Sequence, residues 1–151
     1  MTAWRRRTKG DPAVVALADR HYSRLAYGRA GTQVGPPGRL LVFMTADERA
    51  LWVSHWPQAR MALDRLDAWR CVLFRNEGPT LSSVLVRAAM AATTAEWGAG
   101  PADGWLTWVD TAHVRSSNPG FCFQMAGWWV DWSWASRGKR SRTLVRLRCA
   151  A

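Results

Sequence analysis

Two short segments of this 151-residue chain carry side chains suited to acid–base chemistry. His21, Tyr22 and Ser23 follow a predicted helix; an imidazole can act as a base or bind a metal, and a phenol can donate a proton. Asp110 ends the apolar run 105–110, so its carboxylate is expected at a sheet edge, where open α/β sheets bind ligands. His21, Tyr22 and Asp110 are thus candidate catalytic residues, although their spacing alone favours structural roles. Structural alternatives are a histidine offsetting a helix dipole, a core tyrosine with a solvated hydroxyl, and an aspartate capping a turn.

A polar turn from Arg75 to Thr80 separates the apolar run 71–74 from a long alanine-rich segment. Gly78 and Pro79 favour a turn followed by the start of a helix, which predicts a strand, a turn and a helix over 80–97. The unpaired amides at such a helix start form an anion site, commonly occupied by phosphate. The alternative is an ordinary strand-to-helix connection. The candidate phosphate-binding residues are Arg75, Asn76, Gly78, Thr80, Ser82 and Ser83.

The charge of the chain predicts a polyanionic partner. The net charge is +10, and only Lys9 and Lys139 among the 21 basic residues are lysines. Codon bias would account for arginine over lysine but not for the shortage of acidic residues. Nucleic acid is the partner that this charge most commonly indicates. The predicted DNA contacts lie near the two ends of the chain, at Arg5, Arg6, Arg7, Arg137, Lys139, Arg140 and Arg142.

Eleven tryptophans accompany this charge. The run from Trp128 to Trp134 alternates in a way that predicts a strand, with Trp128, Val130, Trp132 and Trp134 on one face. Such a face could stack on nucleobases. A tryptophan-packed core or a homodimer interface is an equally good interpretation.

The elements that would position these residues follow from hydrophobic periodicity and turn residues. Residues 1–10 are expected to be a mobile basic arm, and Asp11 and Pro12 to start a helix that ends near Arg20 or Tyr22. Residues 27–38 are predicted to be a loop over an active site. The predicted strands are 39–45, 50–56, 70–75, 105–110 and 143–149, and the later helices are 80–97 and a short one ending at Met125.

This order predicts an α/β fold with a mixed, mostly antiparallel sheet flanked by helices, as one domain over residues 11–151. Three widely spaced cysteines, Cys71, Cys122 and Cys149, are expected to be reduced core residues. The sequence contains no apolar stretch typical of a membrane span or a signal peptide, so the expected location is the cytoplasm.

The pattern Arg75-x-x-Gly78-x-Thr80 resembles the coenzyme A pyrophosphate loop of the GNAT acyltransferases, although Pro79 lacks an amide donor. A wider set of segments resembles the phage Mom family of DNA-modification proteins over most of residues 19–130. These segments are His21-Tyr22-Ser23, Phe74 to Gly78, Leu81-Ser82-Ser83, Thr107 to Asp110, and Asn118 to Trp128. Phe121 stands where that pattern leads us to expect a tyrosine.

The resemblance implies a GNAT-like fold, an acetyl-coenzyme A or related acyl donor bound by residues 75–83, and carbamoylmethylation of adenine N6 in double-stranded DNA, which protects phage genomes from restriction. It further implies that His21, Tyr22 and Asp110 line the reaction centre of a phage- or prophage-encoded protein in a bacterial cell. Iron has been proposed for the family, and His21, Tyr22 and Asp110 would then be the ligands. His55 and His113 could join such a site, but no metal-binding spacing supports this. The alternatives are an acetyltransferase acting on a small-molecule or protein amine, and a noncatalytic DNA-binding module.

Overall fold

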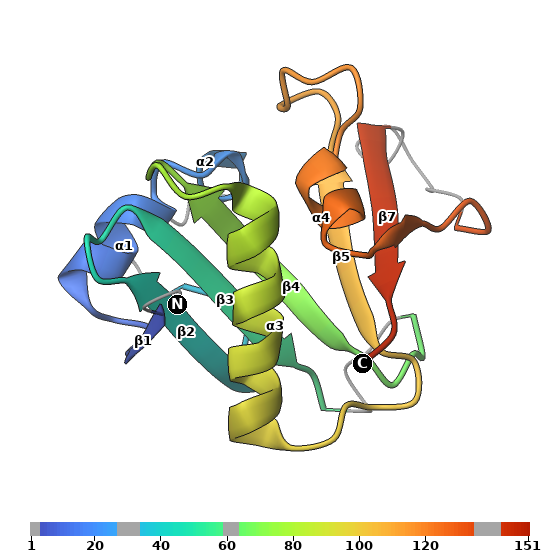
Figure 1. The fold of residues 1–151 in the computed structure, drawn as a ribbon, viewed down its shortest axis with the longest axis horizontal. Helices are drawn as coiled ribbons and strands as arrows, with labels where there is room; N and C mark the ends of the chain where they lie inside the picture. The colour runs from blue at the N-terminus through green and yellow to red at the C-terminus, as the bar shows by residue number, and fades with distance from the viewer. Residues whose placement is uncertain (1–3, 27–33, 59–63, 135–142) are drawn as a thin grey trace.

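A computed structural model describes residues 4–26, 34–58, 64–134 and 143–151 (Figure 1). They form one seven-stranded sheet in the order β1-β2-β3-β4-β5-β7-β6, in which only the β4–β5 pair is parallel. The predicted α/β class with a mostly antiparallel sheet is therefore confirmed. The strands are β1 (Trp4–Arg7), β2 (Arg39–Thr45), β3 (Ala50–Trp56), β4 (Trp69–Asn76), β5 (Trp105–Asp110), β6 (Trp129–Val130) and β7 (Leu144–Cys149). The helices are α1 (Pro12–Ala18), α2 (Tyr22–Ala26), α3 (Ser82–Trp97) and α4 (Phe121–Met125).

The hairpin of β2 and β3 has the predicted bounds, as does β5. Thr45 holds the turn between β2 and β3: its hydroxyl donates to the Asp47 carboxylate at 2.6 Å and accepts from the Ala50 amide at 3.0 Å. Glu48 has a φ of 58° in this turn. Short polar side chains that bond neighbouring backbone groups are typical of such turns, which explains why the sequence signal was reliable here.

The prediction of a mobile N-terminal arm is wrong for residues 4–7. They form β1, which pairs with β2 in antiparallel register from Trp4 opposite Thr45 to Arg7 opposite Val42. Arg6 forms an ion pair with Glu96 at 2.9 Å, and Arg7 contacts Asp11 at 3.0 Å and Glu48 at 2.9 Å. Backbone pairing with β2, supported by these ion pairs, thus makes this segment an edge strand.

The first helix starts as predicted, because the Asp11 side chain accepts from the Ala13 amide at 2.9 Å and Pro12 follows it. The helix ends at Ala18, earlier than expected, and a second short helix, α2, begins at Tyr22. His21 therefore lies before a helix rather than at the end of one. The alternative in which His21 offsets the negative end of a helix dipole does not fit this position.

The two faces of the sheet have separate cores. Val14, Leu17 and Ala18 of α1 pack against one face, over a cluster that includes Val53 and Leu73. Helices α3 and α4 pack on the other face, and Figure 1 shows α3 lying across it. Four tryptophans are almost completely buried in this second core, namely Trp52, Trp69, Trp105 and Trp128. For them the alternative of a tryptophan-packed core is correct.

The predicted tryptophan strand from Trp128 to Trp134 is wrong. Its regular part is β6, only two residues long, and a turn follows. Trp128 is 3% exposed whereas Trp132 is 87% exposed, so the two do not share a face.

Several predictions fall partly outside the described residues. These are the loop at 27–33 and the basic residues Arg137, Lys139, Arg140 and Arg142. In the part of the chain that is described, no helix is long and apolar enough to cross a membrane. All three cysteines are free thiols; Cys71 is buried, and Cys122 and Cys149 are partly exposed.

Candidate active site

The parallel strands β4 and β5 separate shortly after they meet. Their ladder pairs Trp69 with Trp105 and Arg70 with Leu106, and then stops. The Thr107 hydroxyl donates to the Cys71 carbonyl at 2.9 Å, in place of a further backbone bond. A bulge in β4 accompanies the separation, because Ser54 and Val53 of β3 pair with Cys71 and Leu73 and leave Val72 unpaired. Bulges bend a strand and redirect its side chains, and they are common beside active sites.

Two cavities, of about 170 Å³ and 360 Å³, lie at this separation. The smaller reaches α4, and the larger opens beside Asp110 and Leu144. Both are lined by His21, Tyr22, Cys71, Val72 and Trp108. Strand separation therefore creates space next to the predicted catalytic residues.

The structure brings His21, Tyr22 and Asp110 together, although 88 residues separate Tyr22 from Asp110. The Tyr22 hydroxyl accepts a hydrogen bond from the Asp110 amide at 3.2 Å. The rings of His21 and Tyr22 lie with their centroids 4.3 Å apart. Burial is the main cause of a raised pKa of Tyr22, so the phenol stays protonated at neutral pH.

His21 is held as a neutral imidazole. Burial, and secondarily the charge of Arg75, lower the pKa of His21 to about 4. Its Nδ1 accepts from the Ser23 amide at 3.2 Å and lies 2.8 Å from the Ser23 hydroxyl. At neutral pH this ring can accept or donate hydrogen bonds but carries no charge.

His113, named from the sequence only as a residue that could join a metal site, lies beside the predicted catalytic residues. Its Nδ1 lies 2.9 Å from the Asp110 carboxylate, and its ring stacks on Tyr22 with centroids 5.1 Å apart and an interplanar angle of 11°. Burial acts to raise the pKa of Asp110, but hydrogen bonds from Thr143, the Ala112 amide and His113 together hold it below its ordinary value. The signal in the sequence was the spacing Asp110-x-x-His113 directly after a strand. A carboxylate that orients one imidazole nitrogen leaves the other available for proton transfer.

Hydrogen bonds engage Tyr22 and Asp110, two of the predicted iron ligands. Both oxygens of the Asp110 carboxylate have partners, namely the Ala112 amide at 3.0 Å and His113. The Tyr22 hydroxyl is engaged by the Asp110 amide. Outside the undescribed segments, no group of three or more histidine, cysteine, aspartate or glutamate side chains is placed to hold a metal ion.

The predicted phosphate loop is organised by Asn76. Its carbonyl oxygen accepts from the Gly78 amide at 2.9 Å, and its amide donates to the Thr80 carbonyl at 2.7 Å and to the Ser82 hydroxyl at 3.0 Å. These bonds extend the turn, so α3 starts at Ser82 with Leu81 as its N-cap. Pro79 and Thr80 therefore precede the helix, contrary to the prediction. The first amides of α3, from Ser82 and Ser83, have no partner within the helix.

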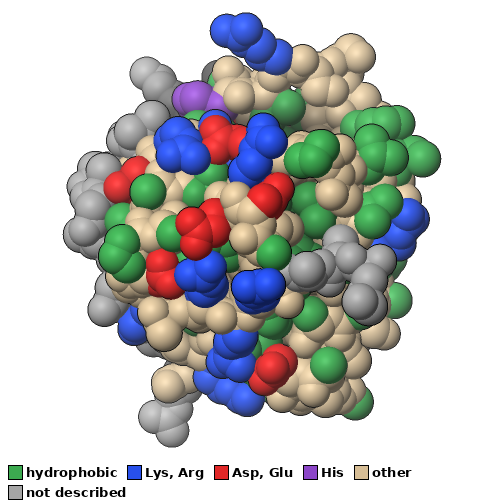
Figure 2. All heavy atoms as spheres, turned by 60° about the vertical axis from the view of Figure 1, so that its left-hand side comes forward, with side chains coloured by type: hydrophobic (Ala, Val, Ile, Leu, Met, Phe, Trp, Pro, Cys, Tyr) green, Lys and Arg blue, Asp and Glu red, His purple; other side chains and the backbone are tan. Residues whose placement is uncertain are grey.

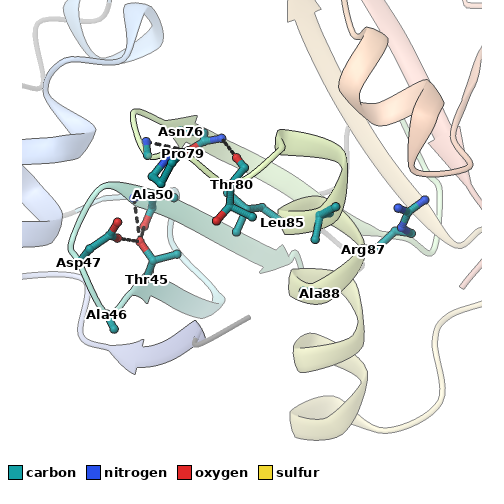
Figure 3. A pocket seen from close by; sticks show the side chains of 12 residues that line it. Thr45, Ala46, Asp47, Ala50, Asn76, Pro79, Thr80, Leu85, Arg87 and Ala88 are labelled. Atoms are coloured by element: carbon teal, nitrogen blue, oxygen red, sulfur yellow. Dashed lines mark hydrogen bonds between the residues drawn. The ribbon is translucent and has the colours of Figure 1, made fainter. Parts of the chain in front are cut away.

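A cavity of about 800 Å³ adjoins this loop (Figure 3). Asn76, Gly78 and Thr80 line it from the loop, and Thr45 and Asp47 from the β2–β3 turn. Hydrogen bonds from Thr45 and the Arg49 amide are the main cause of a lowered pKa of Asp47, so a phosphate here would meet a carboxylate. Arg87 is the arginine that lines this cavity, and Figure 3 shows it directed toward α4.

The loop cavity shares no lining residue with the two cavities around Tyr22. Asn76, Gly78 and Thr80 therefore line a different cavity from His21, Tyr22 and Asp110. Arg75 does not line the loop cavity. It donates to the Arg20 carbonyl at 2.8 Å, next to His21, and to Glu77 at 3.1 Å.

Glu77 forms ion pairs with both Arg20, at 2.6 Å, and Arg75. The hydrogen bonds from Arg20 and then Arg75 lower the pKa of Glu77 to about 2. Because the carboxylate is favoured in the folded state, these bonds stabilise the fold fully at a pH above the ordinary carboxyl pKa. Their contribution is lost as Glu77 becomes protonated, when the pH falls toward about 2. We expect Glu77→Gln to unfold more easily than the wild type at neutral pH, with the difference shrinking on acidification. Urea unfolding over a pH series measures this, and Glu48→Gln, which alters an exposed ion pair to Arg7, should show a weaker pH dependence.

The predicted DNA contacts of the N-terminal segment lie far from this site along the sheet. Strand β1, with Arg5, Arg6 and Arg7, forms one edge, whereas β7 and β6 lie at the other. Figure 2 shows basic and acidic side chains intermingled on the half of the molecule that includes β1 and α1. Because Arg6 and Arg7 are engaged in ion pairs, this edge is not a uniformly basic surface.

Compared with known proteins, the chain matches no protein-family model, no curated protein and no solved structure. Fold and geometry alone therefore define the class of site. It is a cavity at the divergence of two parallel strands, with a neutral imidazole, a half-buried phenol and an aspartate–histidine pair at its rim.

Proposed function

We propose that this protein is a Mom-type DNA-modifying enzyme, which uses acetyl-coenzyme A or a related acyl donor to modify adenine at N6. The observation that carries the proposal is the meeting of His21, Tyr22 and Asp110 at the β4–β5 separation, as the family resemblance requires. The net charge of +10 supports a polyanionic substrate.

The residues around the Tyr22 cavities are suited to the modification of an exocyclic amine. Adenine N6 is stacked and paired in a duplex, so an enzyme acting on it works in the major groove or extrudes the base. The amine is a weak nucleophile: as its nitrogen bonds to the acyl carbon of the donor, the thioester C–S bond breaks, the carrier thiol leaves and the nitrogen loses a proton. His113, oriented by Asp110, would accept that proton, and the neutral His21 and Tyr22 would hydrogen-bond the base or the transferred group.

The donor would lie on the side of the sheet covered by α3 and α4. The free amides of Ser82 and Ser83 suit its diphosphate. Exposed apolar side chains at the start of α3 and on α4 offer a surface for the arm of a thioester carrier. They are Leu81, Val84, Phe121 and Met125, with exposures of 72%, 39%, 54% and 55%. The smaller Tyr22 cavity reaches the same helix through Cys122 and Phe123.

Nucleoside analysis tests this proposal directly. Bacterial DNA isolated after expression of the protein is digested and its nucleosides are examined by mass spectrometry. We expect a modified adenosine with the mass of an added carbamoylmethyl or related group. An unmodified adenosine pool, with soluble folded protein present, would overturn the proposal.

Titration calorimetry with acetyl-coenzyme A distinguishes the remaining alternatives. Cofactor binding with unmodified DNA would point to an acetyltransferase for a small-molecule or protein amine. DNA binding without cofactor binding would point to a noncatalytic module. Only cofactor binding together with modified adenosine agrees with the proposed function.

A further inference from the structure

The C-terminal half of the sheet has two chemically different faces. Side chains alternate along a strand, so Trp105, Val109 and Leu147 point to the core under α3 and α4. The residues between them point the other way. This opposite face carries Trp108 on β5, Arg146 and Arg148 on β7, and Trp129 on β6, paired as Trp108 with Arg146 and Trp129 with Arg148.

A rigid turn extends this face beyond the edge of the sheet. The Asp131 carboxylate accepts from the Ser133 amide at 3.1 Å and from the Ser133 hydroxyl. Arg146 donates to the same carboxylate at 2.6 and 3.0 Å, and both side chains are less than one tenth exposed. The guanidinium of Arg146 also lies 5.8 Å from the Trp134 ring. Within this fixed turn Trp132 is 87% exposed, and the nearby Trp129 is 49% exposed.

Exposure of two indoles costs solvation free energy without benefit to the fold. A flexible turn could hide Trp132 against the sheet, but the buried ion pair holds the turn in place. The arrangement therefore indicates a binding role for these rings rather than a packing role.

The charge of this region indicates what the rings bind. From Trp129 to the last residue the sequence contains six basic residues and one acidic residue, Asp131; the structure describes two of the six, Arg146 and Arg148. That carboxylate is already neutralised by Arg146. Exposed aromatic rings within a basic region are the pattern with which proteins bind unpaired nucleic acid, by stacking on bases and attracting the backbone.

The face also leads to the candidate active site. Trp108, the strand partner of Arg146, lines both cavities beside His21 and Tyr22. A strand of nucleic acid lying across β7 would thus pass from the exposed tryptophans toward the catalytic residues. This continuity favours nucleic acid over a lipid surface, which also binds basic and aromatic residues.

We propose that Trp132 and Trp129 form a stacking site for unpaired bases of the DNA substrate, beside the cavity that receives the target adenine. This inference rests on the proposed function in taking DNA as the substrate. It concerns affinity, whereas the proposed function concerns modification, so the two can fail separately.

Fluorescence anisotropy with three labelled DNAs tests the stacking site: a duplex, the same duplex with a single-stranded gap, and the single strand. We expect Trp132→Ala to weaken binding to the gapped and single-stranded DNA on the order of tenfold, as loss of one stacked base does. The slope of affinity against salt should stay unchanged, because no phosphate contact is removed. Trp132→Phe should restore most of the affinity, and Trp129→Ala should give a smaller loss.

Thr94→Ala is the control, since Thr94 is an exposed residue of α3, which packs on the opposite side of the sheet. It should bind all three DNAs like the wild type. The proposal is overturned if Trp132→Ala binds every DNA as the wild type does. It is also overturned if Trp132→Ala loses affinity for vesicles of anionic phospholipid but not for DNA. Adenosine modification with unchanged affinity in Trp132→Ala would leave the proposed function standing and reject the stacking site alone.

Discussion

His21→Ala and Asp110→Ala are expected to lower DNA modification by about a hundredfold or more, the range that loss of a positioned acid or base produces. Asp110→Ala removes the carboxylate that orients His113 at 2.9 Å, whereas the backbone amide of residue 110 can still donate to Tyr22. His21 supplies the neutral imidazole beside the phenol. Modified adenosine in digested DNA, quantified by mass spectrometry, measures the effect.

The same variants should retain the DNA affinity and salt dependence of the wild type, because neither side chain carries a positive charge at neutral pH. Glu96→Gln provides a matched control, since Glu96 is an exposed carboxylate paired with Arg6 at the other edge of the sheet. It should modify DNA like the wild type. Full activity in His21→Ala would show that the catalytic assignment is wrong, whatever the protein binds.

Substitution of His113 tests whether Asp110 acts by orienting His113 or in another way. If Asp110 acts by orienting His113, His113→Ala should reduce modification about as much as Asp110→Ala, and the double variant should add little further loss. Near-normal activity in His113→Ala alone would assign Asp110 a role independent of the pair.

The order of the central strands and α3 could be predicted from the sequence because local signals specified it. The runs 39–45 and 50–56 are apolar, and a polar turn with its own side-chain bonds lies between them. The start of α3 was missed by two residues because Asn76 binds both Thr80 and Ser82. The sequence shows an asparagine there but not the partners of its amide group.

Strand β1 was missed for a related reason. Trp4 to Arg7 carries three consecutive arginines and little apolar character, so periodicity alone favours a solvated arm. The contacts that fix the strand are distant in sequence: the Trp4 indole donates to the Leu85 carbonyl at 3.2 Å, and Arg6 pairs with Glu96.

In the candidate site, too, some features could be predicted from the sequence and others could not. His21, Tyr22 and Asp110 were predicted together from a family resemblance, since no local spacing relates residues so far apart. The Asp110–His113 pair was accessible in principle from its spacing of three residues. The sequence could not show that the phosphate loop and the catalytic residues line different cavities. This arrangement depends on the bulge at Val72 and on the contact of Arg75 with the Arg20 carbonyl.

Among substitutions of buried polar residues in the described C-terminal half, Asp131→Ala should lower the free energy of unfolding most, by about 3–5 kcal/mol. Its carboxylate and the Arg146 guanidinium are 7% and 9% exposed and lie 2.6 Å apart. Burial acts to raise the pKa of Asp131, but the Ser133 and Arg146 bonds hold it below its ordinary value, so the pair is ionised at neutral pH. Removing one partner leaves a buried charge without compensation. At roughly 2–4 °C per kcal/mol for a chain of this size, Tm should fall by about 10 °C in calorimetry.

Replacing both partners distinguishes loss of the ion pair from a general loss of packing. In Asp131→Leu with Arg146→Met neither charge remains buried, and most of the lost stability should return, as it does when buried pairs are replaced by apolar residues. Because Asp131 also fixes the turn that presents Trp132, the double variant should fold well yet lose part of its affinity for gapped DNA. Wild-type stability in Asp131→Ala would show that the turn is held by other contacts, and the rigid display of Trp132 would then need another cause.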